Sequence, residues 1–197
     1  MLKTEKTATI KPIVFERATV AIKGETELIM HKWSEKAIGM IDDNQQGKTR
    51  TKKDKKDPTQ DYLDSMYTLP DGSPAFPASG FKTAIVDACR MMENLPMVSA
   101  RTNIFVVGEF IKINGEPRMR RDMVRIGMGT ADIRYRAGFP EWSCELTIEY
   151  NPSFITFDQL VNLINAAGYG GVGEWRPSTK VGKNGWAGRF RVAADNE

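Results

Sequence analysis

Glycines, cations and aromatic side chains are concentrated near the end of this 197-residue chain. Seven glycines fall between residues 168 and 188, interspersed with basic and aromatic residues. Glycine lets backbone amides approach a phosphate closely, cations bind phosphates, and aromatic rings stack on bases. This stretch is therefore predicted to bind nucleic acid, and its candidate residues are Gly170, Gly171, Gly173, Trp175, Arg176, Lys180 and Lys183. Tyr169 and Trp186 are further stacking candidates, although packing against the sheet fits Trp186 equally well.

A second basic region lies between residues 112 and 136 and is predicted to be a hairpin insertion. Asn114-Gly115 is a strong signal for a two-residue hairpin turn. It joins a β-rich run at 103–113 to a strongly cationic return at 116–126. An arm with this much charge is a poor core element, so we predict a projecting ribbon that contacts a polyanion or a neighbouring subunit. Its candidate phosphate-binding residues are Arg118, Arg120, Arg121 and Arg125.

A third basic run lies at 47–56, where six Lys or Arg residues accompany one Asp. Such a run favours a solvated, flexible loop, which we place at 42–58. Clamping of a phosphate backbone is the alternative interpretation. The net charge of the whole chain is only +3, so the clustering of the cations, rather than their total, indicates a polyanionic partner.

Catalytic and metal-binding chemistry has few candidates in this sequence. His31 is the single histidine and could be the general acid or base of a metal-independent ribonuclease, although a lone histidine is more often structural or simply exposed. Asp42, Asp43, Asp54 and Asp57 are the carboxylates that could bind a divalent ion, but they lie in the basic loop, so no metal and no cofactor is predicted. Cys89 and Cys144 lack metal-ligand spacing and are expected to be reduced core residues.

Alternation and helical periodicity predict one α+β domain over residues 1–197. Strands are expected at 17–23, 103–111, 143–150 and 186–192, and long helices at 80–93 and 156–168, which is the β-α-β-β-α-β order of a ferredoxin-like (RRM-like) fold. Ser79 is predicted to cap the first helix. Thr156 and Gln159 form a capping box for the second, which we expect to end at Gly168. The predicted buried stripes are Phe81, Ala84, Ile85, Ala88, Cys89 and Met92 in the first helix, and Phe157, Leu160, Val161, Ile164 and Ala167 in the second.

Hydropathy gives no indication of a membrane protein. No apolar run reaches the roughly 18 residues of a transmembrane helix, and the first residues lack the apolar core of a signal peptide. With 41% hydrophobic residues, the composition indicates a soluble domain, which we expect to be cytoplasmic and without a membrane partner.

Three of these features resemble the RAMP superfamily, the repeat-associated proteins of CRISPR effector complexes. The stretch Phe76-Pro77-Ala78-Ser79-Gly80-Phe81-Lys82-Thr83-Ala84, followed by Arg90, resembles the family's "I-P-G-S-S-L-K-G-A-L-R" helix start, with Ala78 and Thr83 in place of two motif glycines. The stretch 170–188 is similar to the family's glycine-rich loop, and the basic hairpin to the thumb of its backbone subunits. The resemblance implies a diverged RAMP-like subunit, of CRISPR or phage origin, in which Lys82 and Arg90 lie near phosphates.

Together these observations predict a non-catalytic protein that binds single-stranded nucleic acid, with RNA favoured over DNA. It is expected to self-associate along the strand or to be a subunit of a larger complex. Two alternatives stay open at this point. One is a metal-independent RNA-processing endonuclease that uses His31. The other is a structural or adaptor protein of a phage or effector assembly, whose cations would face acidic protein surfaces.

Overall fold

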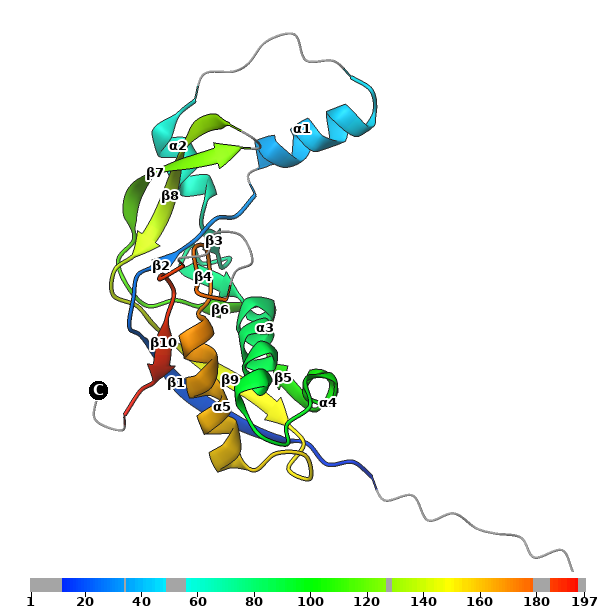
Figure 1. Ribbon diagram of the computed structural model, residues 1–197. Coiled ribbons are helices and arrows are strands. Elements are labelled where there is room, and N and C mark those ends of the chain that lie inside the picture. Colours follow the sequence, from blue (N-terminus) through cyan, green and yellow to red (C-terminus); the bar gives the residue numbers. More distant parts are fainter. Residues whose placement is uncertain (1–11, 34, 49–55, 127–128, 179–184, 195–197) are drawn as a thin grey trace, which may run out of the picture.

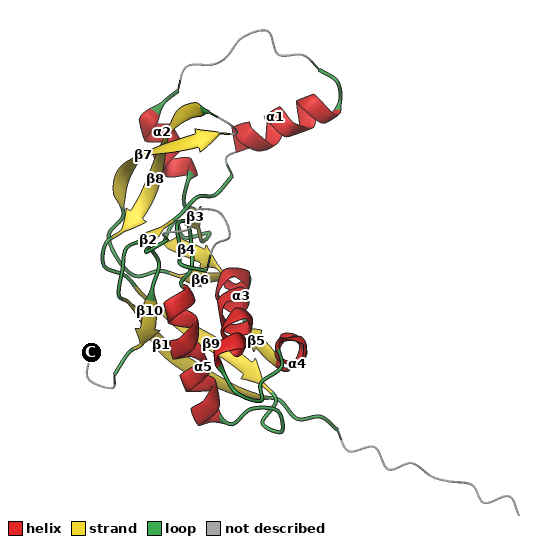
Figure 2. Cartoon of the chain, in the orientation of Figure 1, coloured by secondary structure: helices red, strands yellow, loops and turns green. Residues whose placement is uncertain are grey.

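The computed structural model describes residues 12–33, 35–48, 56–126, 129–178 and 185–194 (Figures 1 and 2). These residues form antiparallel sheets and five α-helices, which confirms the predicted α+β class. The strands are β1 (Glu16–Gly24), β2 (Leu28–Ile29), β3 (Tyr67–Thr68), β4 (Pro74–Pro77), β5 (Ile104–Val106), β6 (Phe110–Lys112), β7 (Arg118–Ile126), β8 (Thr130–Phe139), β9 (Ser143–Tyr150) and β10 (Phe190–Val192). The helices are α1 (Glu35–Gln45), α2 (Pro58–Asp64), α3 (Ala78–Ala88), α4 (Met97–Asn103) and α5 (Phe157–Gly170), with a 3₁₀ turn, η1 (Cys89–Met91).

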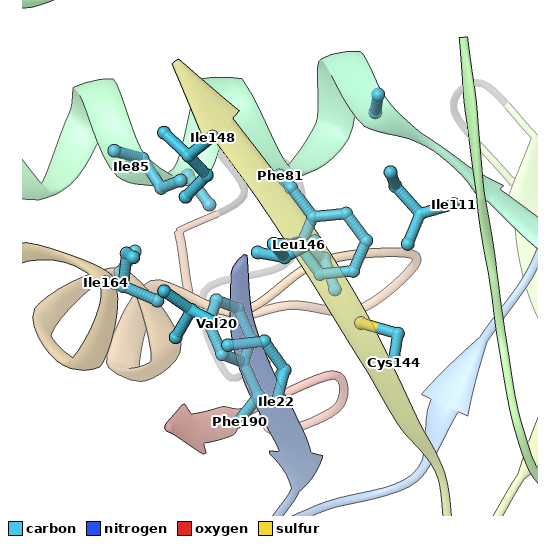
Figure 3. Close-up of a cluster of buried hydrophobic side chains, with 14 of the residues drawn as sticks. Val20, Ile22, Phe81, Ile85, Ile111, Cys144, Leu146, Ile148, Ile164 and Phe190 are labelled. Atoms are coloured by element: carbon cyan, nitrogen blue, oxygen red, sulfur yellow. The ribbon is translucent and has the colours of Figure 1, made fainter. Parts of the chain in front are cut away.

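The main sheet has the strand order β10-β1-β9-β5, with every neighbouring pair antiparallel. Helices α3 and α5 lie side by side on one of its faces (Figure 1). Side chains of β1 and β9 alternate between that face and solvent, so Val20 and its partner Leu146 point into the core. Figure 3 shows this core between sheet and helices. Burial of each Leu, Ile or Phe here contributes about 1.5–3 kcal/mol of transfer free energy.

The helix stripes are largely as predicted. All of the stripe of α3 is buried except Met92, which packs against the core while partly exposed. In α5 the prediction of burial was wrong for Phe157, which is 44% exposed, and Val161 is only partly buried. Leu163, which was not in the predicted stripe, is buried. Both cysteines are buried and free, and burial raises the pKa of the Cys144 thiol to about 12. They are therefore inert core residues, as expected.

The helix ends confirm one prediction and correct two. Gln159 N donates to Thr156 Oγ1 (3.3 Å) and Thr156 N donates to Gln159 Oε1 (3.0 Å), so the capping box is present. Ser79 is not the N-cap of α3, because the fixed backbone of Pro77 already starts the helix at Ala78. α5 continues past Gly168 to Gly170 and ends where Gly171 adopts a φ of +69°. Gly168 is needed for another reason: a Cβ there would collide with the Phe190 carbonyl of β10.

The strand predicted at 103–111 is divided between two sheets. Its first part, β5, is the edge of the main sheet, whereas β6 pairs with β4 in a small sheet of order β3-β4-β6. Between them Gly108 has a φ of +98°, a conformation that favours glycine and redirects the chain. The predicted last strand is also shorter than 186–192, because only Phe190–Val192 pairs with β1.

The basic hairpin has a different turn from the one predicted. Asn114-Gly115 is not the turn; Asn114 forms an isolated bridge with Ser143 instead. The hairpin consists of β7 and β8, whose nine residue pairs run from Arg118 opposite Gly138 to Ile126 opposite Thr130. The nine cross-strand pairs of β7 and β8 contribute more to stability than the turn preference of the single dipeptide Asn114-Gly115, so the hairpin turns after β7 instead. The hairpin extends away from the main sheet, with α2 packed beside β8 and β2 paired to its base (Figure 1).

The predicted basic loop at 42–58 begins inside α1 and ends at the first residue of α2, and residues 49–55 of it lie outside the described part of the structure. Within the described residues, no helix combines the length and apolar character needed to cross a membrane.

Candidate nucleic-acid interface

One side of the hairpin, here called the outer face, carries Met119, Arg121, Met123 and Arg125. These alternate residues of β7 share a side of the strand. All four residues are exposed, and Met123 is 72% exposed. Among the described residues, neither Arg121 nor Arg125 has an ion-pair or hydrogen-bond partner. The outer face therefore presents two unneutralised guanidinium groups, which are suited to phosphate contacts.

The opposite side, here called the inner face, carries Arg118, Arg120, Asp122 and, from β8, Arg136. The carboxylate of Glu27, which precedes β2, is buried against it and accepts hydrogen bonds from Arg118 Nε (2.9 Å) and from Arg120. Arg120 Nη2 also donates to the buried Asp122 (3.0 Å). Two of the four arginines predicted to bind phosphate are thus already paired within the protein.

Trp175 covers this inner face. Its ring centroid lies 5.5 Å from the guanidinium carbon of Arg120 and 5.7 Å from that of Arg136. The Arg136 side chain is only 3% exposed, and burial lowers its pKa, while Glu174 and Asp122 act in the opposite direction. Trp175 is therefore half-buried, and its ring contacts two arginines. The sequence pattern had predicted that this ring would stack on bases.

His31 lies where the hairpin meets the glycine-rich loop. Its Nδ1 is 3.2 Å from Arg136 Nη2 and 3.5 Å from Glu174 Oε1, and its Nε2 is 3.5 Å from Arg134 Nη1. The hydrogen bond with His31 is the largest influence on Glu174 and lowers the pKa of its carboxyl. Burial opposes this shift, and Arg136 adds to it. Glu174 is consequently an ionised carboxylate at neutral pH.

A pocket of about 270 Å³ opens between the start of α3 and the segment 171–178. It brings together the two RAMP-like motifs, because Ser79, Gly80 and Thr83 line one wall and Gly171, Gly173 and Arg176 the other. His31 and Tyr67 also line it, as do the carboxylates of Asp87 and Glu174. Sequence reasoning missed Tyr67, Asp87 and Glu174, since they come from three distant segments and no spacing relates them.

The glycine-rich loop uses its amides internally. The amides of Gly171, Val172 and Glu174 donate to the carbonyls of Ala167, Gly188 and Ile29, at 2.9–3.0 Å. Gly173 has a φ of +81°, and a Cβ on it would lie 2.6 Å from the Ile29 carbonyl. These glycines let the loop pack tightly, so the three amides named above are not free to bind phosphate.

The remaining predicted residues are dispersed. Lys82 Nζ lies 4.2 Å from the ring centroid of Phe105, and Arg90 Nη2 lies 4.0 Å from Asp87 Oδ1. Neither Lys82 nor Arg90 lines the pocket. Tyr169 and Trp186 are exposed, and the guanidinium carbon of Arg189 is 5.4 Å from the Tyr169 ring centroid. Gly170 is the last residue of α5, beside Ser178. Lys180 and Lys183 lie outside the described residues.

Comparison with solved structures identifies the fold. A chain in the cryo-EM structure of the Type III-B Cmr-beta bound to cognate target RNA superposes with a TM-score of 0.52 at 10% sequence identity. The match covers 91% of this chain and 59% of that one, so the present chain spans little more than half of its neighbour. Cmr6 from Pyrococcus furiosus aligns over 92% of this chain and 100% of its own, with a TM-score of 0.45 and 10% identity. No protein-family model and no curated protein sequence matches. The diverged RAMP-like fold predicted from the motifs is confirmed by the first of these similarities.

Proposed function

We propose that this chain is a non-catalytic, RNA-binding subunit that associates with copies of itself or with other proteins along a single strand. The order β10-β1-β9-β5, with α3 and α5 on one face, supports a ferredoxin-like core. In this proposal the β7–β8 hairpin, which extends from that core, is the thumb-like insertion. The structural neighbour with the same fold belongs to an assembly bound to target RNA.

The observation that carries the proposal is the outer face of the hairpin. Arg121 and Arg125 lie on a ribbon that extends from the body, are exposed, and have no described partner to neutralise them. Phosphate contacts of this kind position a protein on a strand without reading its sequence. The open side of the main sheet is less suited to the task, since Arg17 there is paired with Glu149 and Thr19 lies against Thr147.

The test is the double variant Arg121→Ala/Arg125→Ala, with binding to fluorescent single-stranded RNA measured over a range of salt concentrations. Each lost phosphate contact should reduce the slope of log K against log salt by about 0.7, and the loss should be similar for unrelated sequences. The unfolding free energy should stay within about 0.5 kcal/mol of the wild-type value, because both side chains are exposed.

The matched control is Arg17→Ala/Arg189→Ala, which removes the same charge from ion pairs with Glu149 and Glu25 at other surfaces. An unchanged salt slope in the outer-face variant, or an equal change in the control, would contradict the proposal.

The position of His31 in the pocket favours one alternative, metal-independent cleavage of RNA. The proposal instead predicts that the wild-type protein leaves a labelled single-stranded RNA intact in the presence of EDTA. Cleavage under these conditions that disappears in His31→Ala would establish the histidine as a general acid or base and overturn the non-catalytic assignment.

A further inference from the structure

We propose that the pocket at the start of α3 accepts one base of the bound strand, that it prefers guanine, and that Glu174 recognises the Watson–Crick edge of that base. This inference rests on the proposed function and names a specificity that phosphate contacts alone do not provide.

The size of the pocket suits a heterocycle rather than an ion. Its volume of about 270 Å³ is far larger than the roughly 10–15 Å³ that a single water molecule requires. Tyr67, Phe76 and Pro77 are among its apolar and aromatic lining residues. Tyr67 is half-buried, and its phenol pKa is raised by burial and by the charge of Glu174. Aromatic and apolar walls of this kind stack on unpaired bases of single strands.

The charges of the lining exclude phosphate as the preferred occupant. Two carboxylates, Asp87 and Glu174, line the pocket. Among the described residues that line the pocket, the only Lys or Arg is Arg176, which directs its Nη1 to the Gly173 carbonyl at 2.9 Å. The amides of Gly171, Val172 and Glu174 are also occupied within the fold. Such a pocket selects a group that donates hydrogen bonds.

Glu174 has the position and the free acceptor capacity to recognise such a group. Its backbone amide donates to the Ile29 carbonyl at 2.9 Å, which fixes where the side chain starts. Its two carboxylate oxygens are 3.5 Å from His31 Nδ1 and 3.7 Å from Arg136 Nη2. Each carboxylate oxygen has two lone pairs, and one contact at this distance uses no more than one of them, so each oxygen can still accept a further hydrogen bond.

Guanine matches this acceptor pair. Its Watson–Crick edge carries two adjacent donors, N1–H and the 2-amino group, and a carboxylate can accept both at once. Adenine, cytosine and uracil do not present two adjacent donors. On the opposite wall Thr83 Oγ1 donates to the Ser79 carbonyl (2.8 Å), which leaves its lone pairs free to accept from a ribose 2′-hydroxyl.

The experiment measures fluorescence anisotropy with oligouridine 10-mers that carry one central guanosine, inosine, adenosine or cytidine. Inosine retains N1–H and lacks the 2-amino group. We expect guanosine to bind about tenfold more tightly than inosine, as the loss of one charge-assisted hydrogen bond implies. Glu174→Gln should abolish this ratio. Glu145→Gln, which removes an equal charge from the open side of the sheet, should preserve it.

The possible outcomes bear differently on base recognition by the pocket and on the proposed RNA-binding function. Equal affinity of the wild-type protein for all the oligomers overturns base recognition and leaves the RNA-binding function standing. A ratio retained in Glu174→Gln, or lost only in Asp87→Asn, overturns the role of Glu174. Absence of binding to every oligomer at low salt overturns both. If Glu174→Gln does not fold, as thermal unfolding would report, the comparison of guanosine with inosine on the wild-type protein still decides.

Discussion

The two faces of β7 contain the same residue type in opposite situations. On the inner face, Arg118 and Arg120 are paired with Glu27, and Trp175 lies over Arg120. On the outer face, Arg121 and Arg125 are exposed and, within the described structure, unpaired. The difference teaches that a count of cations along a strand does not identify a binding surface. Alternate residues lie on opposite sides of the strand, and those on one side can attach the hairpin to the body, even where a side chain such as Arg118 is still partly in solvent.

The inner face acts as the attachment. Glu27 precedes β2, Asp122 and Arg136 belong to the hairpin, and Trp175 and Glu174 belong to the loop after α5. Three segments that are distant in sequence therefore meet in one partly desolvated cluster of opposite charges. Pairing of this kind is expensive to break, because removal of one partner leaves a buried charge uncompensated.

The largest effect is expected from breaking the inner face. Glu27→Ala leaves Arg118 and Arg120 without their shared carboxylate, and should lower the free energy of unfolding by about 3–5 kcal/mol in a denaturant titration. Glu25→Ala, two residues earlier, removes a partly exposed carboxylate paired with Arg189 and should cost no more than about 1 kcal/mol. A similar small loss in both variants would mean that the inner face is not the anchor described above.

A comparably large effect is expected in the loop that covers the inner face. Gly173→Val forces a β-branched residue to a φ of +81° and drives its Cβ against the Ile29 carbonyl. Strain and overpacking together should cost about 2–6 kcal/mol by thermal or chemical unfolding.

Gly170→Ala provides the matched comparison for Gly173→Val. Gly170 is at the helical end of α5, where a Cβ would meet its nearest atom at 3.5 Å. The free energy of unfolding of the Gly170→Ala variant should differ from the wild-type value by no more than about 1 kcal/mol. If Gly173→Val were as stable as Gly170→Ala, the loop glycines would be free for ligand contacts after all.

The smallest effect on stability is expected at the outer face. Met119→Ala/Met123→Ala removes two exposed side chains, and the unfolding free energy should change by less than about 0.5 kcal/mol. If these methionines contact a neighbouring subunit, cooperative assembly on a long single-stranded RNA should weaken in sedimentation experiments. A loss of more than 1 kcal/mol in stability would instead show that the outer face packs within the molecule.

The parts of the fold that were predictable are those with strong local signals. The alternation in β1 and β9, the periodicity of α3 and α5, and the Thr156–Gln159 capping box each depend on residues within one segment. The errors arose where a local signal competed with pairing between segments. Asn114-Gly115 favours a turn, but the chain after it continues to β7, whose partner is β8. Gly168 favours a helix stop, yet its close contact with β10 requires glycine there inside the helix.

Some features of the candidate site were likewise predictable from the sequence, and others were not. The sequence by itself determined which stretches hold the cations and glycines, and it determined that alternate residues of β7 lie on opposite faces, because the period of a strand is a property of the backbone. Which of those faces turns toward the body was decided by the tertiary structure. It placed Glu27 and Trp175 against Arg120, and it brought Glu174 to the wall opposite Ser79. These contacts join segments with no local relation, so only the folded chain could select Arg121 and Arg125 as the exposed arginines of β7 that have no partner among the described residues.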